Sequence, residues 1–185
     1  MDTHTFCLVN ESSETMEQAV KILIETFPLA GMWPDIDEEQ AIEEVNDCVS
    51  DENICIGIKA NNKLIGWVGL RPMYKTTWEL HPMAVSPEYQ GKGYGKILLS
   101  ELEKIAREKG IIGIYAGSDD ETGKTSLSEI EINRDNILEA IMNIKNYKNH
   151  PYEFYVKCGY NIIGIIPNAN GPQKPDILLW KDIRK

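Results

Sequence analysis

Gln90-Gly91-Lys92-Gly93-Tyr94-Gly95 is the stretch that decides the fold. It follows a strand-like run at 78–85 and leads into an amphipathic helix at 97–107. Glycine allows backbone N–H groups to approach a ligand closely, and a helix N-terminus adds unpaired donors and partial positive charge. Lys92 and Lys96 add full charges. The stretch therefore predicts a cradle for a phosphate or pyrophosphate group, although a tight turn before a helix would also use glycines.

Two common phosphate loops fit this stretch poorly. The Walker pattern needs Ser or Thr after Gly-Lys, and here Ile97 follows Lys96. The dinucleotide fingerprint needs G-x-G-x-x-G, and here the spacing is G-x-G-x-G. The pattern Gln/Arg-x-x-Gly-x-Gly/Ala is met by Gln90, Gly93 and Gly95. In this respect the stretch resembles the coenzyme A pyrophosphate loop of the GCN5-related N-acetyltransferases.

Length and composition predict one globular domain over residues 1–185. The net charge of −10 and the pI of about 4.8 argue against nucleic acid and anionic membranes as partners, and they suit a cationic ligand. No apolar run approaches the roughly 20 residues of a membrane span, and the start Met1-Asp2-Thr3-His4 lacks a signal-peptide pattern. We therefore expect a cytoplasmic location. The four isolated cysteines and three scattered histidines predict reduced thiols and no metal site.

The periodicity of apolar residues predicts the order β-α-α-β-β-β-α-β-α-β-β, an α/β or α+β sheet domain. The first helix is expected to stop at Pro28, and Asp37 with Gln40 forms a capping box that opens the second. A helix is expected within 134–145 and another between Pro151 and Gly159. The expected strands are 6–9, 54–58, 64–70, 76–85, 111–116, 160–166 and 176–183.

Two longer stretches narrow the resemblance. They are Trp-Glu-Leu-His-Pro at 78–82 and His-Pro-Tyr-Glu-Phe-Tyr-Val-Lys-Cys-Gly-Tyr at 150–160, supported by Gly-Ser-Asp-Asp at 117–120 and Pro-Asn-Ala-Asn-Gly at 167–171. Together they look like the aminoglycoside 6′-N-acetyltransferases, in the subgroup typified by a chromosomal enterococcal enzyme. The resemblance implies a central mixed, mostly antiparallel sheet with splayed central parallel strands, flanked by helices. It also implies acetyl-CoA as cosubstrate and a homodimer.

The resemblance implies three catalytic residues. Glu79 and His81 lie two apart on one strand and so share a face. Glu79 takes the place of the candidate base and amine-binding carboxylate, although a surface glutamate would fit the same strand. His81 either shuttles a proton or packs. The resemblance places Tyr155 beside the coenzyme sulfur as general acid or orienting hydroxyl, whereas spacing alone does not choose it over Tyr152 or Tyr160.

The resemblance also implies the binding residues. The backbone at the end of the strand pairs with the pantetheine arm and the glycine loop holds the pyrophosphate, so the expected coenzyme-binding residues are Met83, Ala84, Val85, Gln90, Gly91, Lys92, Gly93, Tyr94, Gly95 and Lys96. An aminoglycoside carries several ammonium groups, and carboxylates with an aromatic wall suit such a ligand. The candidates are Trp33, Tyr74, Glu79, Asp119 and Asp120. Phe27-Pro28 and Trp33-Pro34 both fit the aromatic position, and an ordinary Asp-rich turn would also explain Asp119 and Asp120.

These residues predict direct transfer of acetyl from acetyl-CoA to the 6′-amine of aminoglycosides, an activity that confers resistance. One alternative keeps the chemistry and changes the acceptor to another cationic amine, such as a polyamine, a peptide or a small metabolite. Another is a non-catalytic acetyl-CoA sensor, which would have no need of an acid and a base.

Overall fold

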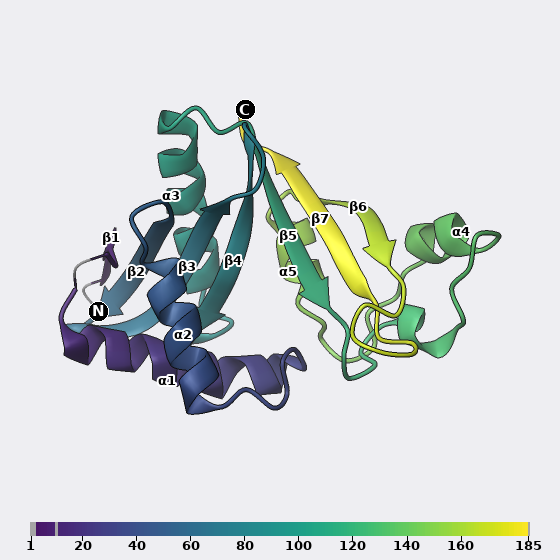
Figure 1. The fold of residues 1–185 in the computed structure, drawn as a ribbon, viewed down its shortest axis with the longest axis horizontal. Coiled ribbons are helices and arrows are strands. Elements are labelled where there is room, and N and C mark those ends of the chain that lie inside the picture. The colour runs from purple at the N-terminus through teal and green to yellow at the C-terminus, as the bar shows by residue number, and fades with distance from the viewer. Residues whose placement is uncertain (1–2, 10, 185) are drawn as a thin grey trace. The chain divides into compact units, whose positions relative to one another are not determined.

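The computed structural model describes residues 3–9 and 11–184, and its strands form a seven-stranded sheet in the order β1-β2-β3-β4-β5-β7-β6 (Figure 1). The sheet is mixed: β1 to β4 pair antiparallel in sequence, β6 pairs antiparallel with β7, and β4 and β5 run parallel. The predicted mixed sheet flanked by helices is therefore confirmed. The splay between its central strands stays a prediction.

The elements have the following bounds. The strands are β1 Thr3–Cys7, β2 Ile54–Ala60, β3 Lys63–Pro72, β4 Thr77–Val85, β5 Gly113–Asp119, β6 Asn161–Ile166 and β7 Asp176–Asp182. The α-helices are α1 Ser13–Ala30, α2 Glu38–Cys48, α3 Tyr94–Glu108, α4 Ile137–Met142 and α5 Tyr152–Lys157. Two short 3₁₀ helices are η1 Pro87–Tyr89 and η2 Ser126–Glu129. None of the helices in the described ranges is both long enough and apolar enough to cross a membrane.

The chain divides into two compact units. The first comprises the described residues of 1–27, 35–114 and 182–185, and the second comprises 28–34 and 115–181. The glycine loop, Glu79, His81 and Tyr74 belong to the first unit, whereas Trp33, Asp119, Asp120 and Tyr155 belong to the second. Each unit is therefore described by itself, and the expectation of a single domain over 1–185 stays a prediction.

In the first unit, helices α2 and α3 cover opposite faces of the strands β2 to β4 (Figure 1). A Cβ atom built on Gly66 would lie 3.3 Å from Leu98 of α3, whereas one built on Gly69 would lie 2.4 Å from Cys48 of α2. The core between these layers is apolar and closely packed, and its fully buried side chains include Leu23, Ile58, Leu64, Ile65, Trp67, Leu70, Leu98, Leu99 and Leu102. Such burial is the main source of stability for the unit.

A bulge interrupts the pairing of β3 with β4. Two residues, His81 and Pro82, lie opposite the single residue Gly69, and the peptide between them is cis. A Cβ on Gly69 would come within 2.4 Å of the carbonyl oxygen of His81, so only glycine fits there. Among an edge, a bulge, a splayed strand and a strand end, the structure therefore places Pro82 at a bulge.

The second unit is organised around a buried histidine. His150 is 2% exposed, and its Nδ1 accepts a hydrogen bond from the backbone N–H of Tyr152 at the start of α5. Its Nε2 therefore carries the hydrogen and donates to the carbonyl of Asp119 at the end of β5 (3.0 Å). The carbonyl and N–H of His150 both bond to the amide of Asn146. Burial lowers the pKa of His150, so the neutral form that this arrangement needs is favoured.

Several predicted boundaries are wrong. Helix α1 does not stop at Pro28 but continues to Ala30, because Lys124 donates hydrogen bonds from Nζ to the carbonyls of Leu29 (3.0 Å) and Ala30 (2.7 Å) and so caps the last turn. The first strand begins at Thr3 and ends at Cys7 rather than spanning 6–9, and β5 spans Gly113–Asp119 rather than 111–116, whereas the helix expected within 134–145 is confirmed as α4. The capping box of Asp37 with Gln40 is confirmed, with N–H···O distances of 2.8 and 3.0 Å.

Candidate active site

The glycine loop has the backbone that a phosphate cradle needs. Gly91 (φ 69°) and Gly93 (φ 91°) are left-handed, and Gly93 is the residue from which α3 begins. Apart from its chain neighbours, no atom of the described residues lies within 4 Å of a Cβ built on either glycine, so both positions face open space. The N-terminus of a helix directs its first N–H groups outward, and the first turn of α3 holds no acidic side chain. The loop can therefore present several N–H donors to an anion.

Gln90 fixes this loop to the end of β4. Its Nε2 donates to the carbonyl of Val85 at 2.9 Å, and the hydroxyl of Thr26 in α1 donates to the same carbonyl at 3.3 Å. The side chain of Gln90 thus holds the loop against the strand, and its part in coenzyme binding stays a prediction. The Nζ of Lys92 donates to the carbonyl of Glu88 (2.7 Å) and lies over the ring of Tyr89 (5.4 Å).

Glu79 is paired with an arginine that the sequence analysis did not single out. Its Oε2 accepts a hydrogen bond from Nε of Arg71 at 2.7 Å, and the two residues are direct cross-strand partners. A second carboxylate, Asp47 of α2, lies 4.0 Å from the same guanidinium. The side chain of Glu79 is 22% exposed and that of Arg71 is 37% exposed, so the pair remains within reach of solvent.

His81 faces a second residue of α2 that the sequence analysis missed. Its Nε2 lies 3.0 Å from Oε1 of Glu44, whose side chain is 14% exposed. Burial raises the pKa of Glu44, but the His81 imidazole and the Arg71 guanidinium outweigh burial and hold that pKa below its usual range. Glu79 and His81 thus face α2 together, as their spacing predicted. Hairpin register would have found Arg71, since it pairs with Glu79, whereas no local pattern marks Glu44.

Tyr155 lies on α5, in the second unit. Its ring is half-buried and packs edge-on against Phe154 and Tyr160, with ring centroids 5.3 and 5.7 Å away. Burial, with a smaller effect from Cys158, raises the pKa of its phenol above the usual range. The hydroxyl therefore stays protonated at neutral pH and can donate a hydrogen bond. Its predicted place beside the coenzyme sulfur stays a prediction.

Asp119 and Asp120 have different surroundings. Asp120 is 1% exposed and accepts four hydrogen bonds, from the N–H groups of Lys124 (2.6 Å) and Thr125 (2.9 Å) and the hydroxyls of Thr125 (2.7 Å) and Ser128 (2.6 Å). Asp119 is half-buried and accepts one from the amide of Asn170. The geometry thus favours a turn-forming role for Asp120, whereas Asp119 keeps more of its carboxylate accessible.

The two predicted aromatic residues lie in separate units. Trp33 is half-buried with φ 44°, and its backbone N–H donates to Oε1 of Glu121 at 2.7 Å, so the loop that follows β5 holds it. Tyr74 is 67% exposed in the turn between β3 and β4. The alternative aromatic, Phe27, is 9% exposed in the core. Among the two N-terminal aromatics, Trp33 is therefore the more accessible.

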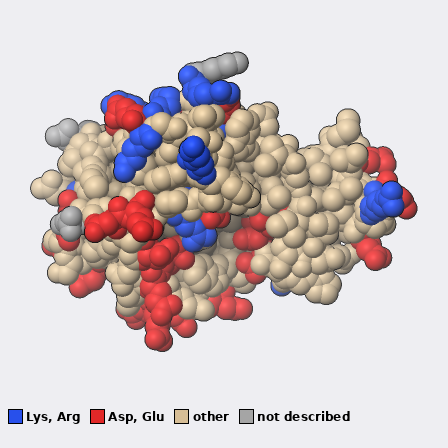
Figure 2. Space-filling view, turned by 45° about the horizontal axis from the view of Figure 1, so that its top comes forward, with Lys and Arg blue, Asp and Glu red and all other residues tan. Residues whose placement is uncertain are grey.

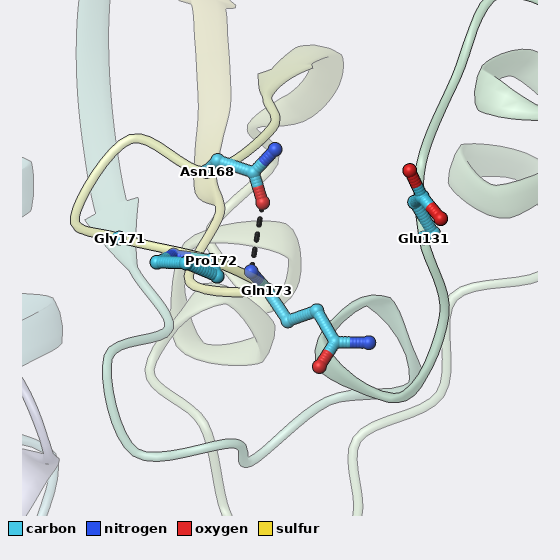
Figure 3. A pocket seen from close by; sticks show the side chains of 5 residues that line it. All are labelled: Glu131, Asn168, Gly171, Pro172 and Gln173. Carbon is cyan, nitrogen blue, oxygen red and sulfur yellow. Dashed lines mark hydrogen bonds between the residues drawn. The ribbon is translucent and has the colours of Figure 1, made fainter.

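A cavity of about 470 Å³ lies in the second unit, lined by Glu131, Asn168, Gly171, Pro172 and Gln173. Figure 3 shows the side chain of Gln173 extending toward Glu131, while its backbone N–H donates to the side chain of Asn168 (2.7 Å). None of the predicted site residues lines this cavity. We therefore place the candidate site at the glycine loop and the carboxylate–imidazole cluster rather than here.

Comparison with known proteins identifies the family. The sequence model of the acetyltransferase (GNAT) family matches residues 16–127, more than half of the chain. The chain belongs to the acetyltransferase (GNAT) family. This membership accounts for the glycine loop between β4 and α3, and it confirms the predicted superfamily.

Solved structures of this family extend the likeness to the whole chain. An aminoglycoside 6′-N-acetyltransferase complexed with coenzyme A is 34% identical, with a TM-score of 0.89, over 100% of this chain and 98% of that one. The aminoglycoside 6′-N-acetyltransferase from Enterococcus faecium is also 34% identical, with a TM-score of 0.86 and the same coverage. The predicted resemblance to these enzymes is thereby confirmed.

A curated relative is similar over a shorter range. The N-alpha-acetyltransferase RimI of Mycobacterium tuberculosis is 34% identical over 64 residues, which are 33% of this chain and 40% of that protein. The chain thus spans less than half the length of this curated relative.

Proposed function

We propose that this GNAT-family protein transfers acetyl from acetyl-CoA to the 6′-amine of aminoglycosides and so confers resistance. The observation that carries the proposal is the 34% identity to aminoglycoside 6′-N-acetyltransferases over the full chain. Glu79 and His81 lie on β4, the strand that precedes the glycine loop, and this arrangement agrees with the proposal. The homodimer and the cytoplasmic location stay predictions.

The glycine loop fits the pyrophosphate of acetyl-CoA. Its open glycine faces leave room for phosphate oxygens, and the first amides of α3 with Lys92 and Lys96 supply donors and charge. The backbone of Met83 to Val85 is the expected partner of the pantetheine arm, but the carbonyl of Val85 already accepts two hydrogen bonds. We therefore assign the N–H groups of this segment the main part of that role. Acetyl-CoA supplies an acyl carbon activated as a thioester.

The charge of the protein suits a polycationic acceptor. The chain carries 29 acidic against 19 basic residues, and Figure 2 shows acidic side chains gathered in a band on one face. We propose that the carboxylate of Glu79 in the first unit and the accessible carboxylate of Asp119 in the second can each attract an ammonium group. Trp33 and Tyr74 are the proposed aromatic contacts, and Asp120 holds the loop that carries Asp119.

The chemistry needs one proton removed and one group protonated. An ammonium at neutral pH must lose a proton before its nitrogen can attack, and Glu79 and His81 are the candidate acceptors. Backbone donors in the segment from Met83 to Val85 are proposed to stabilise the charge that develops on the thioester oxygen. Tyr155, whose raised pKa keeps it protonated, is proposed to donate a hydrogen bond to the departing sulfur.

A second acceptor class has its own support. The similarity to the N-alpha-acetyltransferase RimI, although limited to 64 residues, favours a peptide amine as the alternative acceptor. The same acidic surface would accommodate a basic peptide, and the same β4 residues would serve the transfer.

The proposal is tested by thiol release from acetyl-CoA with kanamycin A, spermine and a basic peptide as separate acceptors. Turnover with kanamycin A and an acetyl group on its 6′-nitrogen, located by NMR, is the expected result. Turnover confined to spermine or the peptide would reject the aminoglycoside as substrate while keeping the reaction. Tight binding of acetyl-CoA without turnover on any acceptor would favour a sensor.

A matched pair of variants links the activity to the site. Glu79→Gln is expected to lower kcat/KM for the acceptor at least tenfold, with unchanged affinity for acetyl-CoA. Glu108→Gln, an exposed glutamate at the far end of α3, is the control and should leave both unchanged. Equal activity of the two variants would remove Glu79 from the site.

A further inference from the structure

Glu79 and His81 are each paired with a charged side chain from another element, and the two partners carry opposite charges. Glu79 accepts a hydrogen bond from Arg71 through Oε2. His81 faces a carboxylate through Nε2, at 3.0 Å from Glu44. On one face of β4, the carboxylate of Glu79 is thus paired with a cation and the neighbouring imidazole of His81 is paired with an anion. Such pairing suggests two roles, since a paired carboxylate attracts ammonium groups and an oriented imidazole moves protons.

Glu44 lies where its charge can orient the imidazole ring of His81. Its Oε1 is shielded from solvent and, within residues 3–9 and 11–184, has no partner with good hydrogen-bond geometry, but Nε2 of His81 lies within ion-pair distance of it at 3.0 Å. An ionised carboxylate presents only lone pairs, so at 3.0 Å it repels an unprotonated Nε2 and favours the tautomer with the hydrogen on Nε2. The proximity of His81 and Arg71 keeps Glu44 ionised despite its burial. In the neutral imidazole, the lone pair then lies on Nδ1.

We propose that Glu44 is a positioning residue that fixes the Nε2–H tautomer of His81, so that Nδ1 of His81 takes the proton from the acceptor amine while Glu79 binds that amine. The assignment rests on the proposed function. The acceptor ammonium gives one proton to Nδ1, and Glu44 faces the resulting imidazolium. The freed nitrogen lone pair forms the bond to the acyl carbon, and the carbon–sulfur bond breaks with its electron pair leaving on sulfur. A second proton then passes from the nitrogen to the thiolate, so that the products are the amide and the free thiol of coenzyme A.

The charged groups around His81 agree with this division. Glu44 and Asp47 approach from α2, Arg71 from β3 and Glu79 from β4 itself. Arg71 lies between Asp47 and Glu79 and is bound on both sides. Its guanidinium is thereby kept on Glu79, so Glu44 is left as the anion that faces the imidazole.

The tautomer is tested first, without any substrate. Long-range ¹H–¹⁵N spectra of ¹⁵N-labelled protein report which ring nitrogen of each histidine carries the hydrogen, and His81→Asn assigns the signal of His81. His150, whose Nδ1 accepts from Tyr152, is an internal reference for the Nε2–H form. We expect His81 to show that form, and Glu44→Met to convert it to a mixture. A hydrogen on Nδ1 of His81 in the unaltered protein would overturn the proposal.

The role in the reaction is tested by kinetics with the acceptor that the thiol-release screen identifies. Glu44→Met is expected to lower kcat about tenfold to a hundredfold with the acceptor KM changed less than about twofold. Glu44→Gln keeps an acceptor oxygen and should fall between. Glu43→Met, an exposed neighbour on the same helix, is the control and should match the unaltered protein. An unchanged kcat in Glu44→Met would overturn the catalytic part of the proposal.

The two measurements separate this inference from the proposed function. Turnover on a peptide or polyamine would reject the aminoglycoside, but Glu44→Met would still have to lower kcat. If no acceptor is turned over, the proton transfer at Nδ1 falls with the function, while the spectra still decide whether Glu44 fixes the ring. A melting temperature close to that of the unaltered protein excludes unfolding as the cause of a low rate.

Discussion

Replacing Asp120 should destabilise the second unit by an amount that the structure allows us to work out. Its buried carboxylate accepts four hydrogen bonds, from groups on Lys124, Thr125 and Ser128. A hydrogen bond to a charged group contributes about 1.5–3 kcal/mol, but neighbouring bonds are not additive. We therefore expect Asp120→Ala, which leaves these donors without their acceptor, to lower the free energy of unfolding by about 3–5 kcal/mol.

The isosteric change should have a smaller effect. In Asp120→Asn one oxygen can keep the three bonds now made by Oδ2, from Thr125 and Ser128, whereas the amide nitrogen faces the N–H of Lys124 and one bond is lost. We expect a loss of about 1–2 kcal/mol. Asp51→Ala, at an exposed turn, is the chemical control and should stay within about 0.5 kcal/mol. Urea unfolding followed by circular dichroism measures all three.

The pH dependence has a definite sign. Burial raises the pKa of Asp120, but the bonds from Lys124, Ser128 and Thr125 outweigh burial and hold it below its usual range. A carboxyl group whose pKa is lowered on folding contributes stability above its unfolded pKa, about 3.9, and loses that contribution as pH falls through the folded pKa. The gap between the unaltered protein and Asp120→Ala should therefore be constant above about pH 5 and shrink in acid. A gap under 1 kcal/mol at pH 7, or one that widens in acid, would refute the reasoning.

Three further changes test the loop, the tyrosine and the bulge. Gly93 and Gly110 are both left-handed, lie in open space and flank opposite ends of α3, so replacing either with Ala should lower the free energy of unfolding by about 1–2 kcal/mol. Only Gly93→Ala should also weaken acetyl-CoA binding, at least tenfold, as measured by titration calorimetry. Tyr155→Phe should slow transfer by a factor that stays constant from pH 6 to 9, because the raised pKa keeps the phenol protonated there; a pH–rate profile with a ratio that changes tenfold would contradict this. Gly69→Ala should lower the melting temperature by about 5–10 °C through overpacking at the bulge, whereas Gly164→Ala, where the nearest atom is 3.7 Å away, should change it by less than about 3 °C.

Local patterns predicted the elements well where neighbours in sequence decide the structure. The glycine loop, the capping box at Asp37 and the turn at Asn61 and Asn62 (φ 50° and 64°) depend on residues a few positions apart. The end of α1 does not depend on nearby residues alone, because Lys124, the cation that caps it, lies 94 residues beyond Ala30 in the chain. Pro28 is tolerated in that last turn, and no pattern near it reveals the distant cap.

The same distinction explains which parts of the candidate site were missed. Glu79 and His81 stand out because they alternate on one strand, but their partners come from other elements. Arg71 is eight residues before Glu79 and could have been found by counting the hairpin register back from the turn. Glu44 could not have been found in this way, because its place opposite His81 depends on how α2 packs against the sheet.

Strand β4 carries the proposed acceptor residues Glu79 and His81 and ends five residues before Gln90 of the glycine loop. Glu79 and Val85 are six residues apart, so at about 3.3 Å per residue they are separated by roughly 20 Å along the strand. The bulge opposite Gly69 lies between them and changes the face that each later residue presents, because two residues there oppose one. Without the extra residue, the segment from Met83 onward would shift by one position against β3 and exchange its faces. The bulge therefore lets Glu79 and His81 face α2 without changing the register at the end of the strand. There Gln90 and Thr26 both donate hydrogen bonds to the carbonyl of Val85 and hold the strand end in place. The nine residues of β4 thus set the spacing between the proposed acceptor residues and the segment proposed to bind the coenzyme.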